Sequence, residues 1–381
     1  AVAPIPFAST VYMLAEAVML AGTEAQKAEL LPGIAAGEII GCLATSEGPG
    51  VTTASNGGFG TGGITLKGGT VNSSMGANNT LSFANALTVG TGDTGTFNTP
   101  NRINWSGNVS GAGTLNIGVS TTVSRFDLQN SWTGFTGNAN FTGSGGVRLF
   151  NNGGTFNTAS FQSTALNLDG SVNFQPQTNS GGNTYQIGSL SGSSATASLG
   201  GGTAGRATYS IGGLDTSTSF AGAINGNSAL TKTGSGTLTL TGASTYTGTT
   251  NITGGTLALT GDGALASPNI IVGASTTFDV SGVTGGFSLA SGQTLSGPGA
   301  VTGAMTVTGT LNPGSSPGTM STGSQTWLDG GDYNWQILDA AGVAGTGYDT
   351  IAVTGTLDLS SLTAANFGIN LWSLSSIGPD V

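Results

Sequence analysis

The stretch that decides the fold is residues 230–265, LTKTGSGTLTLTGASTYTGTTNITGGTLALTGDGAL. Threonines alternate with single leucines over 237–241, leucines recur at every second position in the run TLALT at 256–260, and glycine-rich segments flank both runs. Strict alternation is typical of a β-strand that buries one face, because successive side chains of a strand point to opposite sides. The stretch therefore predicts short strands joined by turns, with Leu238 and Leu257 on the buried face.

The spacing of these strands predicts a stack of coils. Leu238, Leu257, Phe278 and Leu295 begin successive apolar segments at similar separations along the chain. A single coil of this length cannot bury its own apolar face, so neighbouring coils must share one core. At about 20 residues and ~4.8 Å per coil, residues 51–381 would form a rod of roughly 16 coils and ~80 Å. The predicted fold is an all-β, parallel β-helix (solenoid).

The composition of the chain supports this fold and excludes several functions. The 381 residues include 69 Gly, which can supply positive φ at coil corners, but no His and a single Cys. Without His, Ser-His-Asp and Cys-His catalysis and most zinc sites are excluded. A net charge of -10 with 7 Lys+Arg argues against nucleic acids and anionic membranes, so neutral or cationic partners fit better.

The chain divides into two unlike pieces near Gly50. All Glu residues lie before this point, in a segment rich in Ala and Leu with helical spacing. Thr, Ser, Asn and Gly dominate the rest of the chain. We therefore expect two domains, a helical segment at residues 1–50 and the solenoid at residues 51–381.

Three elements are expected in the first segment. A helix over about residues 10–22 is followed by a second helix, which Thr23 and Gln26 open with a capping box. That second helix should end before Gly37, and the apolar run at 39–44 predicts a short strand. Two helices and one strand are too little to enclose a core, so this segment should pack on another part of a protein.

The same segment resembles a fragment of the acyl-CoA dehydrogenase family, at the end of its helical N-terminal domain. The resemblance rests on AQK at 25–27, AGE at 36–38 and TSE at 45–47. It implies that Thr45, Ser46 and Glu47 match positions beside the flavin. The pattern then fails, because no Glu follows position 47 to abstract the α-proton of an acyl-CoA. The alternative of a flavin-dependent dehydrogenase is therefore an inactive fragment, with FAD a partner only if this segment belongs to a complete dehydrogenase, and we expect no cofactor.

Residues 51–381 resemble the autotransporter-associated β-strand repeat of bacterial secreted passengers. The resemblance is strongest over residues 230–359, and internal echoes extend it: GAGTL at 111–115 matches GSGTL at 234–238, and SWTG at 131–134 matches TYTG at 245–248. It implies a right-handed parallel β-helix, exported or displayed on the cell surface, with a structural, adhesive or secretion-assisting role and no catalytic residues in the repeat. We expect no signal peptide, membrane barrel or sorting helix within these residues.

Three arginines are the candidate ligand-binding residues. Arg102, Arg125 and Arg148 are equally spaced along the chain, so a coil as long as that spacing would stack them in one ladder. Such a ladder could hold a sulfated or carboxylated extracellular glycan, but coincidence or solvated ladder ends is the favoured interpretation of the spacing. Trp105 and Trp132 lie near this stripe and could stack on sugar rings, but core or corner packing is the favoured interpretation.

A glycan-cleaving β-helix is the other alternative, and it requires clustered carboxylates. Asp329, Asp332 and Asp349 are the nearest to a cluster, but Asp beside Gly is typical of turns, which we favour over a calcium site or catalysis. The GFGTGG sequence at 58–63 fits a dinucleotide-binding pattern by chance in so glycine-rich a chain. The leading hypothesis is a non-enzymatic surface protein.

Overall fold

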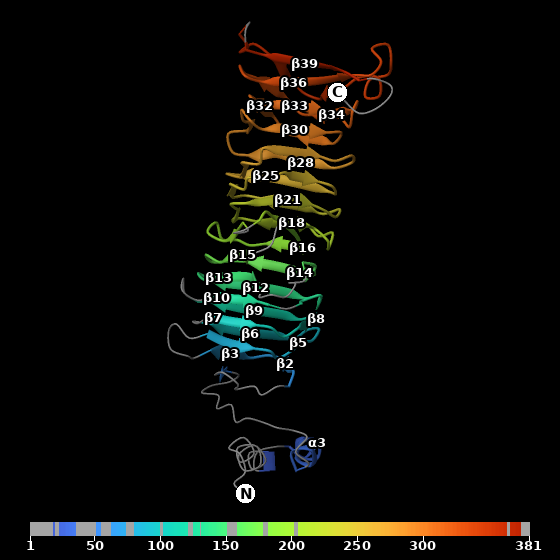
Figure 1. Ribbon diagram of the computed structural model, residues 1–381. Coiled ribbons are helices and arrows are strands. Elements are labelled where there is room, and N and C mark those ends of the chain that lie inside the picture. Colours follow the sequence, from blue (N-terminus) through green and yellow to red (C-terminus); the bar gives the residue numbers. More distant parts are fainter. Residues whose placement is uncertain are drawn as a thin grey trace.

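The structure is a computed structural model. It describes residues 18–19, 23–35, 51–54, 62–73, 80–99, 102–120, 125–129, 131–150, 158–177, 182–201, 205–363 and 366–374. The described part of residues 51–374 is a rod of stacked β-strands (Figure 1). Every strand pair in it is parallel, as between β22 (Thr237–Leu240) and β25 (Thr256–Gly261). The predicted all-β parallel β-solenoid with a short helical appendage is therefore confirmed.

One sheet of fifteen strands, sheet A, runs along the whole rod, and each coil crosses it once. In spatial order its strands are β1 (Val51–Ala54), β3 (Thr70–Ser73), β6 (Thr94–Thr99), β9 (Thr114–Val119), β12 (Asn138–Gly143), β14 (Phe161–Leu168), β16 (Asn183–Ser191), β18 (Ala207–Ile211), β21 (Ser228–Lys232), β24 (Thr250–Ile252), β27 (Asn269–Val272), β30 (Thr294–Gly297), β33 (Thr310–Pro313), β36 (Asp332–Ile337) and β39 (Gly368–Ser373). Sheet A is thus the feature common to all coils.

The other faces of the rod are formed by different sheets in its two halves, which we define as residues 51–232 (N-terminal half) and 233–374 (C-terminal half). Sheet C, of seven strands, contains β4 (Thr80–Phe83), β7 (Arg102–Trp105), β10 (Arg125–Leu128), β13 (Gly146–Phe150), β15 (Asn173–Gln177), β17 (Ser198–Leu199) and β20 (Ala223–Ile224). Sheet B contains β2 (Ile64–Leu66), β5 (Leu87–Val89), β8 (Val109–Gly111) and β11 (Gly134–Phe135). Both sheets belong to the N-terminal half.

Sheets D, E and F replace them toward the C-terminus. Sheet D contains β19 (Thr218–Phe220), β22, β25, β28 (Thr277–Val283), β31 (Ala300–Thr302), β34 (Thr319–Thr322) and β37 (Thr350–Val353). Sheet E contains β23 (Ala243–Ser244) and β26 (Ala264–Leu265), and sheet F contains β29 (Phe287–Leu289), β32 (Met305–Val307), β35 (Gln325–Trp327) and β38 (Leu357–Asp358).

The predicted strand stack is right for three of its four leading residues. Leu238 pairs with Leu257, and Leu257 with Phe278, in sheet D. Leu295 was expected next but lies in sheet A, where it pairs with Ile270 and Leu311. All faces of the coil share the same alternation of apolar and polar residues, so distance along the sequence alone cannot assign a strand to a face.

Coil length varies more than the sequence spacing indicates. In sheet A, Leu230 pairs with Thr250 and Thr250 with Ile270, so these two successive coils are equal in length. The coil from Thr294 to Thr310 is shorter than they are, and that from Asp332 to Gly368 is more than twice as long as this short one. Glycines allow the corners to close tightly: Gly111 has φ 105°, and a Cβ there would collide with the carbonyl oxygen of Val89 on the neighbouring coil.

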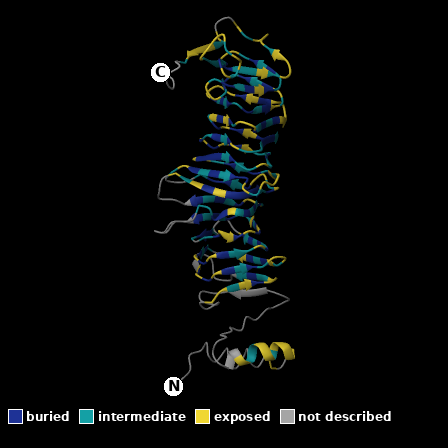
Figure 2. Cartoon of the chain, turned by 90° about the vertical axis from the view of Figure 1, so that its right-hand side faces the viewer, coloured by how far each residue is buried: buried dark blue, intermediate teal, exposed yellow. Residues whose placement is uncertain are grey.

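The core is a continuous apolar column inside the rod (Figure 2). Strands such as β9 alternate between partly exposed and buried residues, with Leu115, Ile117 and Val119 inside. In the N-terminal half this column contains many aromatic rings. Phe83 and Trp105 stack with centroids 5.3 Å apart, and Trp105 lies 6.2 Å from Phe126.

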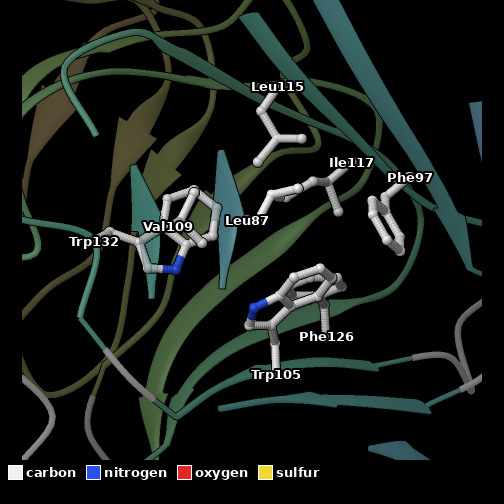
Figure 3. Close-up of a pocket in the computed structure, with 8 residues that line it drawn as sticks. All are labelled: Leu87, Phe97, Trp105, Val109, Leu115, Ile117, Phe126 and Trp132. Carbon is white, nitrogen blue, oxygen red and sulfur yellow. The ribbon is translucent and has the colours of Figure 1, made fainter. Parts of the chain in front are cut away.

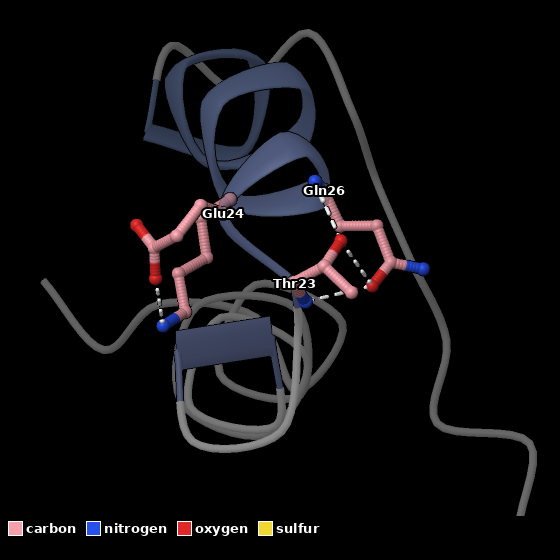
Figure 4. A network of polar contacts seen from close by, with 4 residues as sticks. Thr23, Glu24 and Gln26 are labelled. Atoms are coloured by element: carbon pink, nitrogen blue, oxygen red, sulfur yellow. Dashed lines mark hydrogen bonds and ion pairs between the residues drawn. The ribbon is translucent and has the colours of Figure 1, made fainter.

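The helix α3 (Glu24–Ala35) begins with the predicted capping box (Figure 4). Thr23 N donates to Gln26 Oε1 at 2.9 Å, and Gln26 N donates to Thr23 Oγ1 at 3.3 Å. The helix ends at Ala35, and Pro32 lies inside it. Of the helix expected at 10–22, Val18 and Met19 are helical; the rest of it, and the strand expected at 39–44, lie outside the described residues.

Candidate functional site

The three predicted arginines lie on the outer face of sheet C, on consecutive coils. Arg102 begins β7, Arg125 begins β10 and Arg148 is in the middle of β13. The side chains that alternate with them, such as Phe126 and Val147, are buried in the core. The strand alternation therefore directs all three guanidinium groups outward.

The ladder prediction is right for two arginines and wrong for the third. Arg125 pairs directly with Arg102, as their separation along the chain predicted. Arg148 instead pairs with Asp127, because the next coil brings Gly146 opposite Arg125. The coil from Arg125 to Gly146 is two residues shorter than the coil from Arg102 to Arg125. Arg148 therefore lies two residues further along its strand, opposite Asp127.

Asp127 is the centre of this group, which we call the arginine cluster (Arg102, Arg125, Asp127 and Arg148). Its side chain is fully buried although it is on the outer face of the strand. Asp127 Oδ2 accepts hydrogen bonds of 2.9 Å from Arg102 Nε and of 2.9 Å from Arg125 Nη2. Arg125 Nε is also 2.7 Å from Asp127 Oδ1. Two arginines thus cover one carboxylate and satisfy its charge.

The electrostatics of the cluster are unbalanced toward positive charge. Three guanidinium groups against one carboxylate leave two net positive charges. Burial lowers the pKa of Arg148; the positive charges of Arg125 and Arg102 lower this pKa further, and Asp127 opposes them. Repulsion between neighbouring guanidinium groups would be relieved by a bound anion, and Arg pairs bidentately with carboxylate or sulfate. The chemical capability of the cluster is therefore anion binding.

Asp127 was not predicted as a site residue. The signal that could have found it is the Arg125-Phe126-Asp127 sequence, because residues two apart share one face of a strand. An Arg and an Asp on the same outer face, with Arg102 one coil away, predict an ion pair. Only the register of the third coil, which brings Arg148 beside Asp127, could not be read from this pattern.

The two tryptophans near the cluster are core residues. Trp105 and Trp132 are 2% and 1% exposed, and both point into the apolar column among Leu87, Phe97 and Phe126 (Figure 3). The space between these side chains has a volume of about 0 Å³, so it cannot admit a ligand. Core packing is confirmed for both, and they are not available for stacking on sugars.

The three aspartates considered for metal binding or catalysis are in separate environments. Asp329 accepts hydrogen bonds from Thr363 N and Oγ1, both at 2.8 Å, in the turn after β35. Asp332 is the first residue of β36, and Asp349 is buried at a corner. The turn prediction is confirmed for Asp329 and wrong for Asp332, which is in a strand. No group of three potential metal ligands occurs in the part of the chain that the structure describes.

The remaining sequence candidates lie outside the described residues. These are Thr45, Ser46 and Glu47, the positions that resemble a flavin contact, and most of the glycine-rich sequence at 58–63. The acyl-CoA dehydrogenase resemblance therefore remains a prediction from sequence alone.

The fold and the cluster define a parallel β-solenoid with a cationic patch on one face. Residues 230–259 match a family described as Passenger-associated-transport-repeat. The matched segment runs from β21 to β25, in the part of the rod where successive coils are equal in length. No curated protein matches the chain. Among the described residues, no helix has the length and apolar character needed to cross a bilayer.

Proposed function

We propose that this chain is an exported, surface-displayed β-solenoid of the passenger type, with a structural and adhesive role and no enzymatic activity. The observation that carries the proposal is the coincidence of the transport-repeat match with one complete, regular section of the solenoid. A repeat associated with passenger transport, folded as a rod that other coils extend in both directions, supports a passenger-like role.

The architecture suits a rod that holds a binding surface away from the cell. Fifteen strands of sheet A at ~4.8 Å each extend the rod by about 70 Å. Each coil contacts mainly its neighbours, so coils can form one after another as a chain emerges from an export channel. Such sequential stacking would also support a secretion-assisting role.

Antibodies against residues 51–381 test the location. We expect them to label intact cells of the bacterium that produces the protein, and brief protease treatment of the cells should abolish the labelling. An antibody against a cytoplasmic protein, which labels only after permeabilisation, is the control. Labelling of the solenoid only after permeabilisation would overturn the proposed surface location.

A specific observation favours binding of an anionic glycan as the adhesive activity. The arginine cluster holds three of the seven Lys and Arg residues of the chain around a single carboxylate. Arg102 and Arg125 retain partly exposed side chains, at 38% and 21%. Their remaining N–H groups, together with Arg148, support recognition of sulfate or carboxylate groups spaced along a polysaccharide.

Arg148→Gln is the sharpest test, because it removes a positive charge but neither ion pair of Asp127. Arg206→Gln, an arginine outside the cluster, is the matched control. We expect the wild type to bind heparin or polygalacturonate but not neutral dextran, and Arg148→Gln to weaken binding by about tenfold. Equal binding by both variants would exclude the cluster as the glycan site.

The same polysaccharides distinguish binding from cleavage. We expect no release of reducing ends or unsaturated products during prolonged incubation with the protein. Release of either product by an activity that copurifies with the folded solenoid would favour the glycan-cleaving alternative.

A further inference from the structure

The C-terminal end of the rod contains a cavity of about 450 Å³, far from the arginine cluster. It lies where sheets A, D and F meet and is lined by residues of β35 to β39 and the segments that join them. A volume of this size is within the range of small-molecule sites. It contrasts with the filled core of the N-terminal half, where the space between Trp105 and Trp132 has no room for water.

Aromatic rings form much of the wall of this cavity: Trp327, Tyr333, Trp335, Tyr348 and Phe367. Trp335 and Tyr348 meet edge to face, with centroids 6.2 Å apart and planes at 83°. Trp327 and Phe367 form a second such pair at 5.0 Å and 88°. A ring carries negative charge on its faces and positive charge at its edge, so a cation in this cavity would be attracted to the ring faces that line it.

A buried carboxylate also lines the cavity. Asp349 is 2% exposed, and its two oxygens accept hydrogen bonds from the backbone N–H groups of Gly318, at 2.7 Å, and of Gln336, at 2.9 Å. None of the described residues forms an ion pair with it. Burial raises the pKa of Asp349, and it raises the pKa of Tyr333 to about 12, to which the negative charge of Asp349 also contributes.

The surroundings of the cavity are acidic. The sequence contains eight Asp and no Lys or Arg after Lys232. Asp329, Asp332 and Asp358 lie on the same final coils as the cavity. A cationic ligand would therefore meet an attractive field, and no cationic side chain of this region would compete with it.

We propose that this cavity binds a small alkylated ammonium ion, with the positive group among the aromatic rings and near Asp349. The apolar walls favour a cation that carries methyl groups, because such a cation is weakly hydrated and contributes apolar surface to the contact. A primary ammonium or guanidinium group would lose more hydration on entering and would find few hydrogen-bond acceptors there. A free small molecule fits the volume better than part of a macromolecule.

Tryptophan fluorescence reports binding, since two of the five Trp residues of the chain, Trp327 and Trp335, line the cavity. The whole chain is titrated with tetramethylammonium, with choline and with dimethylbutanol, the uncharged carbon isostere of choline. We expect choline to bind at least about tenfold more tightly than the isostere, as a cation–π contribution predicts. Equal affinities would show that the cavity binds apolar groups without regard to charge and would overturn the proposal.

Two matched pairs of variants locate the site. Tyr348→Phe keeps the ring and should bind choline like the wild type, whereas Tyr348→Leu should lose about tenfold in affinity. Asp349→Asn should also weaken binding, while Asp262→Asn removes the same charge from an exposed residue elsewhere in the C-terminal half and should have no effect. Circular dichroism shows whether each variant is folded. Unchanged affinity in a folded Tyr348→Leu variant would contradict the assignment.

Vesicles of phosphatidylcholine separate the two sources of this chemistry. We expect free choline to bind in the cavity and change tryptophan fluorescence, and we expect the vesicles to leave this fluorescence unchanged. Binding to the vesicles without binding of free choline would overturn the proposal of a small soluble ligand.

Discussion

The two halves of the rod share sheet A but fill their cores differently. Buried aromatic residues are concentrated in the N-terminal half: Phe83, Phe97, Trp105, Phe126, Trp132, Phe135, Phe141, Phe161, Phe174, Tyr185, Tyr209 and Phe220. In the C-terminal half the same column consists mainly of Leu, Ile and Val, as at Leu257, Ile270 and Leu311. A ring fills more of the cross-section of a coil than an aliphatic side chain can, because its volume is larger.

The halves differ in charge as well. Residues 51–232 contain six Lys and Arg against four Asp, whereas the rest of the solenoid has Asp and no cation. The cationic cluster lies on the aromatic half, and the apolar cavity lies at the acidic end of the other half, in its longest coil. The difference teaches that regular repeats build the rod, and that departures from the repeat bring chemically distinctive side chains together.

The largest expected effect tests whether the aromatic core holds the N-terminal half together. Trp105→Ala removes a ring in contact with Phe83, Phe97 and Phe126 and should cost about 3–5 kcal/mol of unfolding free energy. Because each coil depends mainly on its neighbours, the loss should appear as faster amide hydrogen exchange in the N-terminal half alone.

Leu257→Ala is the corresponding change in the C-terminal half. Leu257 is fully buried, so about 2–5 kcal/mol should be lost, with faster exchange in the C-terminal coils. If either variant accelerates exchange equally along the whole rod, the solenoid unfolds as a single cooperative unit and the division into halves has no energetic meaning.

The next effect concerns the ion pairs that are specific to the N-terminal half. Asp127→Asn leaves three guanidinium groups without their carboxylate and should cost about 3 kcal/mol in denaturant unfolding. Added sulfate should restore part of this loss, because the anion can replace the missing charge. Asp93→Asn, the same substitution outside the cluster in the same half, should respond far less to sulfate. An equal response of the two variants would mean that sulfate acts on the whole fold.

The sequence predicts the solenoid well because its signals are local. Alternation over 237–241 and the separation of Leu238, Leu257 and Phe278 predict strands that do pair across successive coils. The assignment of Leu295 fails because all faces of a coil carry the same pattern. The change from sheets B and C to sheets D, E and F likewise has no counterpart in any single motif.

The candidate site is predictable to the same extent. The pairing of Arg102 with Arg125 follows from their separation, but the coil that ends at Arg148 is two residues shorter than expected. The burial of Asp127 depends on that register, and so on packing between three coils. The cavity at Asp349 depends on residues as distant in sequence as Trp327 and Phe367, which no local pattern connects.

The smallest effect is a pH dependence of opposite sign in the two halves. In the N-terminal half, Asp169 accepts hydrogen bonds from Asn167 Nδ2, Ser193 N and Ser194 N, and these lower its pKa, that from Asn167 most. Its stabilisation is present above the unfolded-state pKa of ~3.9 and is lost as the pH falls through the folded-state value. Because Asp169 is only partly buried and water screens its hydrogen bonds, we expect less than about 1 kcal/mol.

Asp349, in the C-terminal half, should show the reverse. Burial raises its pKa, so its contribution is greatest below the unfolded-state value and is lost as the pH rises through the folded-state value. Unfolding free energies of the wild type, Asp169→Asn and Asp349→Asn, measured at intervals from about pH 2 to pH 7, separate these slopes from the constant cost of each substitution. The unfolding free energy of Asp169→Asn should be lower than that of the wild type at neutral pH, and this difference should disappear toward acid pH. The unfolding free energy of Asp349→Asn should be lower than that of the wild type at acid pH, and this difference should shrink toward neutral pH. Parallel pH profiles for the two variants would show that the halves do not differ in the way that the lowered pKa of Asp169 and the raised pKa of Asp349 predict.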